Sequence, residues 1–160
     1  MSGDYTMTTI FGRMALVPNP ALQPLSWLVG VWDTTGRHPM LTGMVLHGRT
    51  SCEWSEGGAF LTMRSEIDEP GVPDGIAIIG SDDAAGRLFM SYFDERRVSR
   101  LYEIAVHDKV MRWWRDAPGF SQRYTYTLAD DGQTIHGTGQ LCKDGSTWEQ
   151  DLELVFSRAR

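Results

Sequence analysis

The chain has 160 residues and a formal net charge of −6, and 41% of its residues are hydrophobic. This length corresponds to one domain with a sizeable core. The acidic balance disfavours a nucleic acid or an anionic membrane as partner, because both require a basic face. Six tryptophans among 11% aromatic residues indicate an aromatic-lined interior.

Two features bear on location. The first twenty residues contain neither a basic leader nor an apolar run of signal-peptide length, and no stretch reaches the roughly 18 apolar residues of a membrane span. Cys52 and Cys142 fall in separate predicted strands. Without a secretory signal they favour reduced core thiols over a disulfide. The sequence therefore predicts a cytoplasmic domain that is not bound to a membrane.

The chain begins with an aperiodic stretch. Residues 1–19 contain Pro18 and predict an extended arm, and residues 20–160 predict a single domain. Leu25, Trp27 and Leu28 indicate a short apolar helical turn that runs through Gly30 into a strand. Packing of the arm on a second copy would give a homodimer, and a free tail is the equal alternative.

From Gly30 onward short strands alternate with turns such as Asp131-Gly132 and Asp144-Gly145. The predicted strands are residues 30–38, 45–55, 59–67, 76–80, 87–93, 98–106, 109–115, 121–128, 133–142 and 147–157. About ten strands at hairpin spacing predict an all-β fold, a single closed antiparallel up-and-down β-barrel. Closure removes exposed strand edges, and a barrel of this size has room for a modest ligand.

Alternation along each strand predicts which side chains face inward. Trp32, placed two residues after Gly30, is expected to close one end of the barrel. The side chains expected to line a ligand site are Trp32, Trp54, Met63, Tyr92, Arg100, Tyr102, Trp113, Arg115, Tyr124 and Trp148.

Two interpretations of the interior arginines follow. A buried guanidinium is costly unless it is paired, so Arg100 and Arg115 could hold the acidic group of a largely apolar small-molecule ligand. The alternative is that both arginines pair with Asp94, Glu103 or Asp116 and only link strands.

A second function class is a cofactor-independent isomerase, cyclase or lyase. His38, Tyr92, Arg100 and Tyr102 are its candidate catalytic residues. This hypothesis requires Arg100 and Tyr102 to face the interior. The motifs of nucleotide-binding loops, serine hydrolases and zinc sites are missing, so we expect no metal. An interaction module that uses the outer barrel face and residues 1–19 is a further alternative.

Several stretches carry a family resemblance. The opening LVGVWDTTGRHP, with Gly30-Val31-Trp32, resembles the first strand of calycins, the lipocalin and fatty-acid-binding-protein class. CEWSEGGAFL, SYFDERRVSRLYE and TWEQDLELVFSR resemble uncharacterised bacterial lipocalin-like barrels near the nitrobindins. The resemblance covers about residues 25–158 in the same order and implies the barrel fold of this group, which has no settled activity.

Nitrobindins bind haem through a histidine near the C-terminus, and here the chain departs from them. No histidine follows His136, and the last predicted strand contains none. Use of His38, His47 or His107 would require a different geometry. The expected cofactor is therefore none, with haem as the minority alternative.

Overall fold

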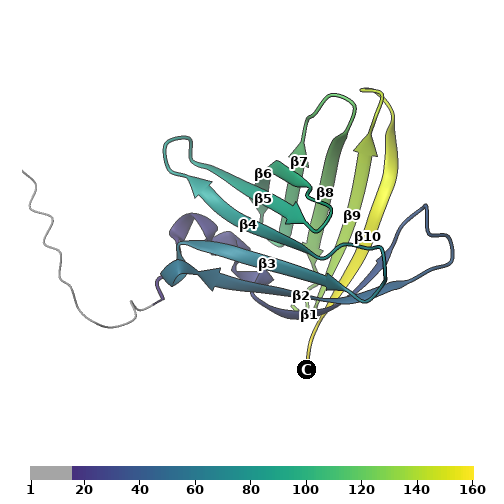
Figure 1. The fold of residues 1–160 in the computed structure, drawn as a ribbon. Coiled ribbons are helices and arrows are strands. Elements are labelled where there is room, and N and C mark those ends of the chain that lie inside the picture. Colours follow the sequence, from purple (N-terminus) through teal and green to yellow (C-terminus); the bar gives the residue numbers. More distant parts are fainter. Residues whose placement is uncertain (1–15) are drawn as a thin grey trace, which may run out of the picture.

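A computed structural model describes residues 16–160, which form ten strands and two short 3₁₀ helices (Figure 1). The elements are η1 (Pro20–Leu28), β1 (Gly30–Arg37), β2 (Leu46–Ser55), η2 (Glu56–Gly58), β3 (Phe60–Ile67), β4 (Gly75–Asp82), β5 (Arg87–Asp94), β6 (Ser99–His107), β7 (Val110–Arg115), β8 (Ser121–Leu128), β9 (Thr134–Cys142) and β10 (Trp148–Arg158). Each strand pairs antiparallel with its chain neighbours, and β1 pairs with β10. The predicted closed up-and-down barrel is confirmed.

The strands form where inward and outward residues alternate. In β1, Trp32, Thr34 and Gly36 are buried, and the residues between them are exposed or half-buried. This period of two matches the pleat of a strand, so one face of each strand enters the core. The N-terminal arm predicted over residues 1–19 lies mostly outside the described residues.

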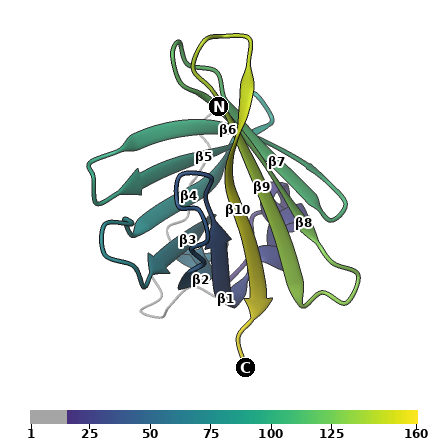
Figure 2. The ribbon, with the colours of Figure 1, turned by 90° about the vertical axis from the view of Figure 1, so that its right-hand side faces the viewer.

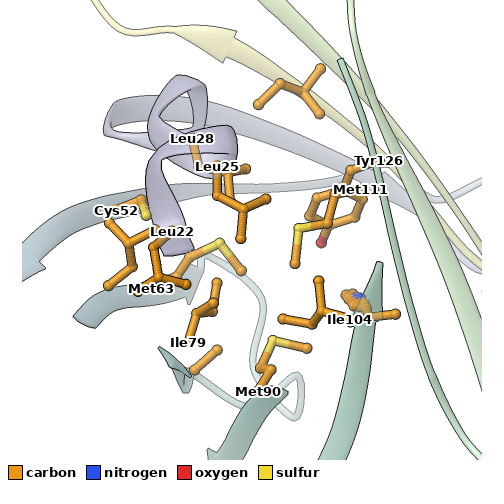
Figure 3. Close-up of a cluster of buried hydrophobic side chains, with 14 of the residues drawn as sticks. Leu22, Leu25, Leu28, Cys52, Met63, Ile79, Met90, Ile104, Met111 and Tyr126 are labelled. Atoms are coloured by element: carbon orange, nitrogen blue, oxygen red, sulfur yellow. The ribbon is translucent and has the colours of Figure 1, made fainter. Parts of the chain in front are cut away.

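One end of the barrel is closed by η1. Leu22, Leu25 and Leu28 are buried on this helix, and their side chains enter the barrel (Figure 3). Pro20 and Pro24 suit a short helix, because proline presets the backbone angle and lacks the amide hydrogen. The leucines pack against inward side chains such as Met63 and Ile79.

The apolar half of the barrel, around η1, is nearly filled with side chains. The internal void between Leu28, Trp32, Met63 and Phe156 has a volume of about 10 Å³. Such a void holds about one water molecule. A ligand larger than a water molecule therefore has no space beside η1 with the side chains packed in this way.

Arg158, the last residue of β10, holds η1 against the barrel. Its guanidinium lies 4.2 Å from the centre of the Trp32 ring and donates hydrogen bonds to the carbonyls of Val29, Trp27 and Gly132 at 3.1, 3.3 and 3.0 Å. The Trp32 indole donates in turn to the carbonyl of Leu28 at 2.9 Å. The predicted end-closing role of Trp32 thus involves a partner from the last strand.

Gly30 is needed at this junction for two reasons. Its φ of 139° lies in a region that side chains disfavour, and a Cβ there would lie 2.7 Å from a guanidinium nitrogen of Arg158. The glycine therefore allows both the bend into β1 and the close approach of the arginine.

The opposite end of the barrel carries the loops 38–45, 68–74, 95–98, 116–120 and 143–147, and we call it the open end. Figure 2 shows the barrel turned by 90°, with η1 behind β8.

Cys52 and Cys142 are buried free thiols, as predicted. Among residues 16–160, neither helix is long and apolar enough to cross a membrane.

We predict that Arg158→Met lowers the free energy of unfolding by about 2–4 kcal/mol, because it removes three charge-assisted hydrogen bonds and the contact with Trp32. Arg49→Met is the control, since Arg49 makes an exposed ion pair with Asp33, and its effect should stay within about 0.5 kcal/mol. Urea unfolding of both variants measures the difference. Equal losses would contradict the fastening role of Arg158.

Candidate functional site

Polar side chains form a layer inside the barrel between the apolar core and the open end. They come from strand ends near the open end, so the antiparallel register brings them to one level. The members are His38 after β1, Arg100 and Tyr102 on β6, Arg115 on β7, Gln122 and Tyr124 on β8 and Asp151 on β10. We call this set the inner polar layer.

Gln122 is at the centre of the layer. Its Oε1 accepts hydrogen bonds from Tyr102 at 2.8 Å and from Arg100 at 3.1 Å. Its Nε2 donates to the Tyr124 hydroxyl at 3.0 Å. A guanidinium can only donate, so the orientation of the Gln122 amide follows from its neighbours.

Asp151 terminates the chain of hydrogen bonds. Its Oδ2 accepts from the Tyr124 hydroxyl at 2.6 Å, and its Oδ1 lies 2.9 Å from Nε2 of His38. Nδ1 of His38 accepts from the backbone N–H of Met40 at 3.1 Å. In the neutral ring the proton therefore lies on Nε2, and both ring nitrogens have partners. This arrangement ties the loop after β1 to β10.

Tyr124 reaches Asp151 because β9 carries a glycine between them. Tyr124 and Gly139 are direct cross-strand partners, and a Cβ at Gly139 would overlap the Tyr124 ring. Gly137 has the same relation to Tyr126, where a Cβ would lie 2.8 Å from the ring. The two glycines thus allow two tyrosines to lie across β9.

The two interior arginines have no acidic partner. Within residues 16–160, no carboxylate lies within 4.0 Å of the guanidinium of Arg100 or Arg115. Arg100 lies 4.9 Å from the Phe120 ring centre, and Asp94 pairs instead with Arg96 at 2.7 Å. The alternative in which acidic neighbours neutralise both arginines is therefore wrong for this part of the chain.

The tyrosines of the layer are neutral hydrogen-bond donors. Burial raises the pKa of Tyr102, and the charges of Arg100 and Arg115 oppose that rise. Burial and then the Asp151 carboxylate raise the pKa of Tyr124 far above its ordinary value.

The predicted ligand-site residues divide into three groups. Arg100, Tyr102, Arg115 and Tyr124 belong to the inner polar layer, and Trp113 packs beside it with ring centres 4.5 Å from Tyr124 and 5.8 Å from Tyr102. The residues Trp32, Trp54 and Met63 belong to or pack against the apolar core. The remaining two are Tyr92, which donates to Asp94 at 3.0 Å, and Trp148.

The expectation that Trp148 faces the interior is wrong. A β-bulge between Gln150 and Glu153 changes the phase of β10, so Phe156 faces the core whereas Trp148 lies on the outer side. There, the guanidinium of the exposed Arg123 lies 3.9 Å from its ring centre.

Sequence reasoning missed Asp151 as a site residue and left Gln122 out of the site. Asp151 is only 8% exposed and lies within the bulged segment, whose position is not visible from alternation. Gln122 shares the inward face with Tyr124, and a polar residue on an otherwise aromatic face was the available signal.

The four histidines do not suit a haem site. Haem iron requires an axial ligand inside the pocket. Three of the histidines, His47, His107 and His136, are exposed. The ring of His38 is held by hydrogen bonds with Asp151 and Met40. Among residues 16–160, no three His, Cys, Asp or Glu side chains gather as a metal site would require.

The comparisons with known proteins support the fold alone. No protein-family model matches the chain, and no curated protein matches it. Among solved structures it is similar to Rv2717c from M. tuberculosis, with a TM-score of 0.65 and 16% sequence identity over 90% of this chain and 100% of that one. This similarity supports a shared barrel architecture.

We expect Gly139→Ala to lower the free energy of unfolding by about 1–3 kcal/mol, because the new methyl group displaces the Tyr124 ring from Asp151. Thr138→Ala is the control, since Thr138 is the exposed, outward neighbour on β9, and its effect should remain within about 0.5 kcal/mol. Thermal unfolding followed by near-ultraviolet circular dichroism measures both. A loss of stability no greater than that of Thr138→Ala would contradict the close contact between Gly139 and the Tyr124 ring.

Stability should fall as the pH rises above about 10, where tyrosines of the unfolded chain begin to ionise. Burial raises the pKa of Tyr92, Tyr102, Tyr124 and Tyr126, so the folded state keeps protons that the unfolded state loses. Below that pH both states are neutral and this contribution is fully present. Urea unfolding at increasing pH should give a shallower decline for Tyr126→Phe than for the parent chain, and identical slopes would contradict it.

Proposed function

We propose that the protein is a small-molecule-binding barrel of the calycin type whose ligand is largely apolar and carries a carboxylate. The acidic group binds Arg100 and Arg115 in the inner polar layer, and the apolar part lies toward the open end. The observation that carries this proposal is the pair of inward guanidinium groups without a carboxylate partner among residues 16–160.

The hydrogen-bond chain supports this placement of the acid. Asp151 already accepts hydrogen bonds from Tyr124 and His38, so its charge is stabilised by these donors and not by the arginines. Arg100 uses one nitrogen on Gln122, which leaves its other donors available, and the guanidinium of Arg115 makes no hydrogen bond with another described residue. Two guanidinium groups facing one engaged carboxylate give the layer an excess of positive charge.

The loop after β1 suits the apolar part of such a ligand. Met40 is 85% exposed and Met44 is 40% exposed, and both belong to the loop at the open end that His38 holds. Flexible thioether side chains adapt to ligands of differing shape. The filled core beside η1 limits the ligand to the open half of the barrel.

Binding is better supported than catalysis. Arg100 and Tyr102 do face inward, as an enzyme of this kind requires. However, both ring nitrogens of His38 have partners, and the Tyr92 hydroxyl donates to Asp94. The acid–base groups expected for proton transfer are thus engaged in structural hydrogen bonds. We propose no cofactor for the barrel.

Tryptophan fluorescence titrations with 2-naphthoate and decanoate, each beside its matching alcohol, test the proposal. The acid should bind more tightly than the alcohol. Arg100→Gln and Arg115→Gln should each weaken binding of the acid about tenfold, because each removes charge-assisted hydrogen bonds of about 1.5 kcal/mol. Binding of the alcohol should change little.

Arg64→Gln is the matched control, since Arg64 is exposed on β3. It should leave both affinities unchanged. Equal affinity for acid and alcohol, or equal loss in Arg64→Gln and Arg100→Gln, would contradict the proposed role of the interior arginines.

A further inference from the structure

The outer face of β7–β10 carries a hollow of about 390 Å³, which we call the outer groove. These four strands run side by side (Figure 2). Trp114, Arg123 and Gln140 form one cross-strand row in the groove. The volume lies within the range of small-molecule sites.

A second row and a bulge complete the groove. Arg112, Thr125 and Thr138 are cross-strand partners in the row beside the first. The bulge in β10 turns Trp148 outward, so an indole lines the groove on the side opposite Trp114. The groove thus has indoles from β7 and β10 with polar side chains between them.

Arg123 is already oriented for binding. Its Nε donates to Oε1 of Gln140 at 2.7 Å, and its guanidinium lies 3.9 Å from the Trp148 ring centre. These contacts hold the plane of the guanidinium and leave its terminal nitrogens without a described partner. Preorganised donors of this kind bind an anion with little loss of side-chain freedom.

The groove carries an excess of positive charge on an acidic protein. Within residues 16–160, Arg112 and Arg123 have no carboxylate within 4.0 Å. Asp116 also lines the groove but forms no ion pair with either arginine. Among the residues that line the groove, two guanidinium groups and one carboxylate leave a net positive charge, which favours an anionic ligand.

We propose that the outer groove binds an acidic monosaccharide unit. The carboxylate would bind Arg112 and Arg123, and the sugar hydroxyls would bind Thr125, Thr138 and Gln140. The indole of Trp114 would pack against the C–H face of the ring. The hydroxyl and amide groups between the indoles favour a polyhydroxylated ring over an aromatic acid, whose ring offers them no partner.

Nuclear magnetic resonance titration of the full chain with glucuronate, glucose and benzoate tests this site. The reporters are the indole N–H signals of Trp114 and Trp148, assigned with Trp114→Phe and Trp148→Phe. Glucuronate should shift both signals saturably below about 20 mM and bind at least fivefold more tightly than glucose. Arg112→Gln should weaken glucuronate binding at least fivefold, whereas Arg64→Gln on β3 should not.

Each other outcome would overturn the proposal. Equal binding of glucose and glucuronate would remove the role of the arginines, and tighter binding of benzoate would identify an aromatic acid as the ligand. Absence of a saturable shift at either indole would show that the groove binds none of these classes. Because Arg100 and Arg115 lie inside the barrel, their variants should leave this titration unchanged, so the two sites succeed or fail separately.

Discussion

The contact between Arg158 and Trp32 joins the first and last strands and constrains the rest of the barrel. Trp32 belongs to the first strand, Arg158 ends the last, and the guanidinium also donates to the carbonyls of Trp27 in η1 and of Val29 directly after it. One side chain therefore contacts both the first strand, where the barrel closes, and the helix η1 that fills its end. Because η1 fills the barrel from this end, the apolar side chains gather there, and the polar side chains are left at the opposite end.

This division explains why the interior is not one ligand cavity. Beside η1 the leucines, methionines and aromatic rings leave only about 10 Å³. Toward the open end, Gln122 connects polar groups of β6 and β8 through hydrogen bonds of defined direction. The direction runs from guanidinium donors to the Asp151 carboxylate, so the layer has an electrically positive side and a negative side. The acidic group of the proposed ligand would therefore bind on the positive side.

The same chemistry recurs on both surfaces of the sheet. The chain as a whole has a net charge of −6, yet inward Arg100 and Arg115 and outward Arg112 and Arg123 have no carboxylate partner among residues 16–160. An arginine that is paired within the fold, such as Arg96 with Asp94, has little capacity left for a ligand. Local excesses of positive charge on an acidic protein concentrate anions at those places and keep them from the remaining surface.

Local patterns in the sequence determined the strands, the turns and most inward faces, since a strand's period of two and the backbone freedom of glycine act over a few residues. Arg100, Tyr102, Arg115 and Tyr124 were placed inside for this reason. Tertiary structure alone decided the rest. The bulge in β10 turned Trp148 outward, and Gly139 allowed Tyr124 to cross to Asp151. The absence of a carboxylate partner for the interior arginines within residues 16–160 was likewise decided by the fold. These features depend on contacts between strands distant in the chain, and periodicity within one strand carries no information about them.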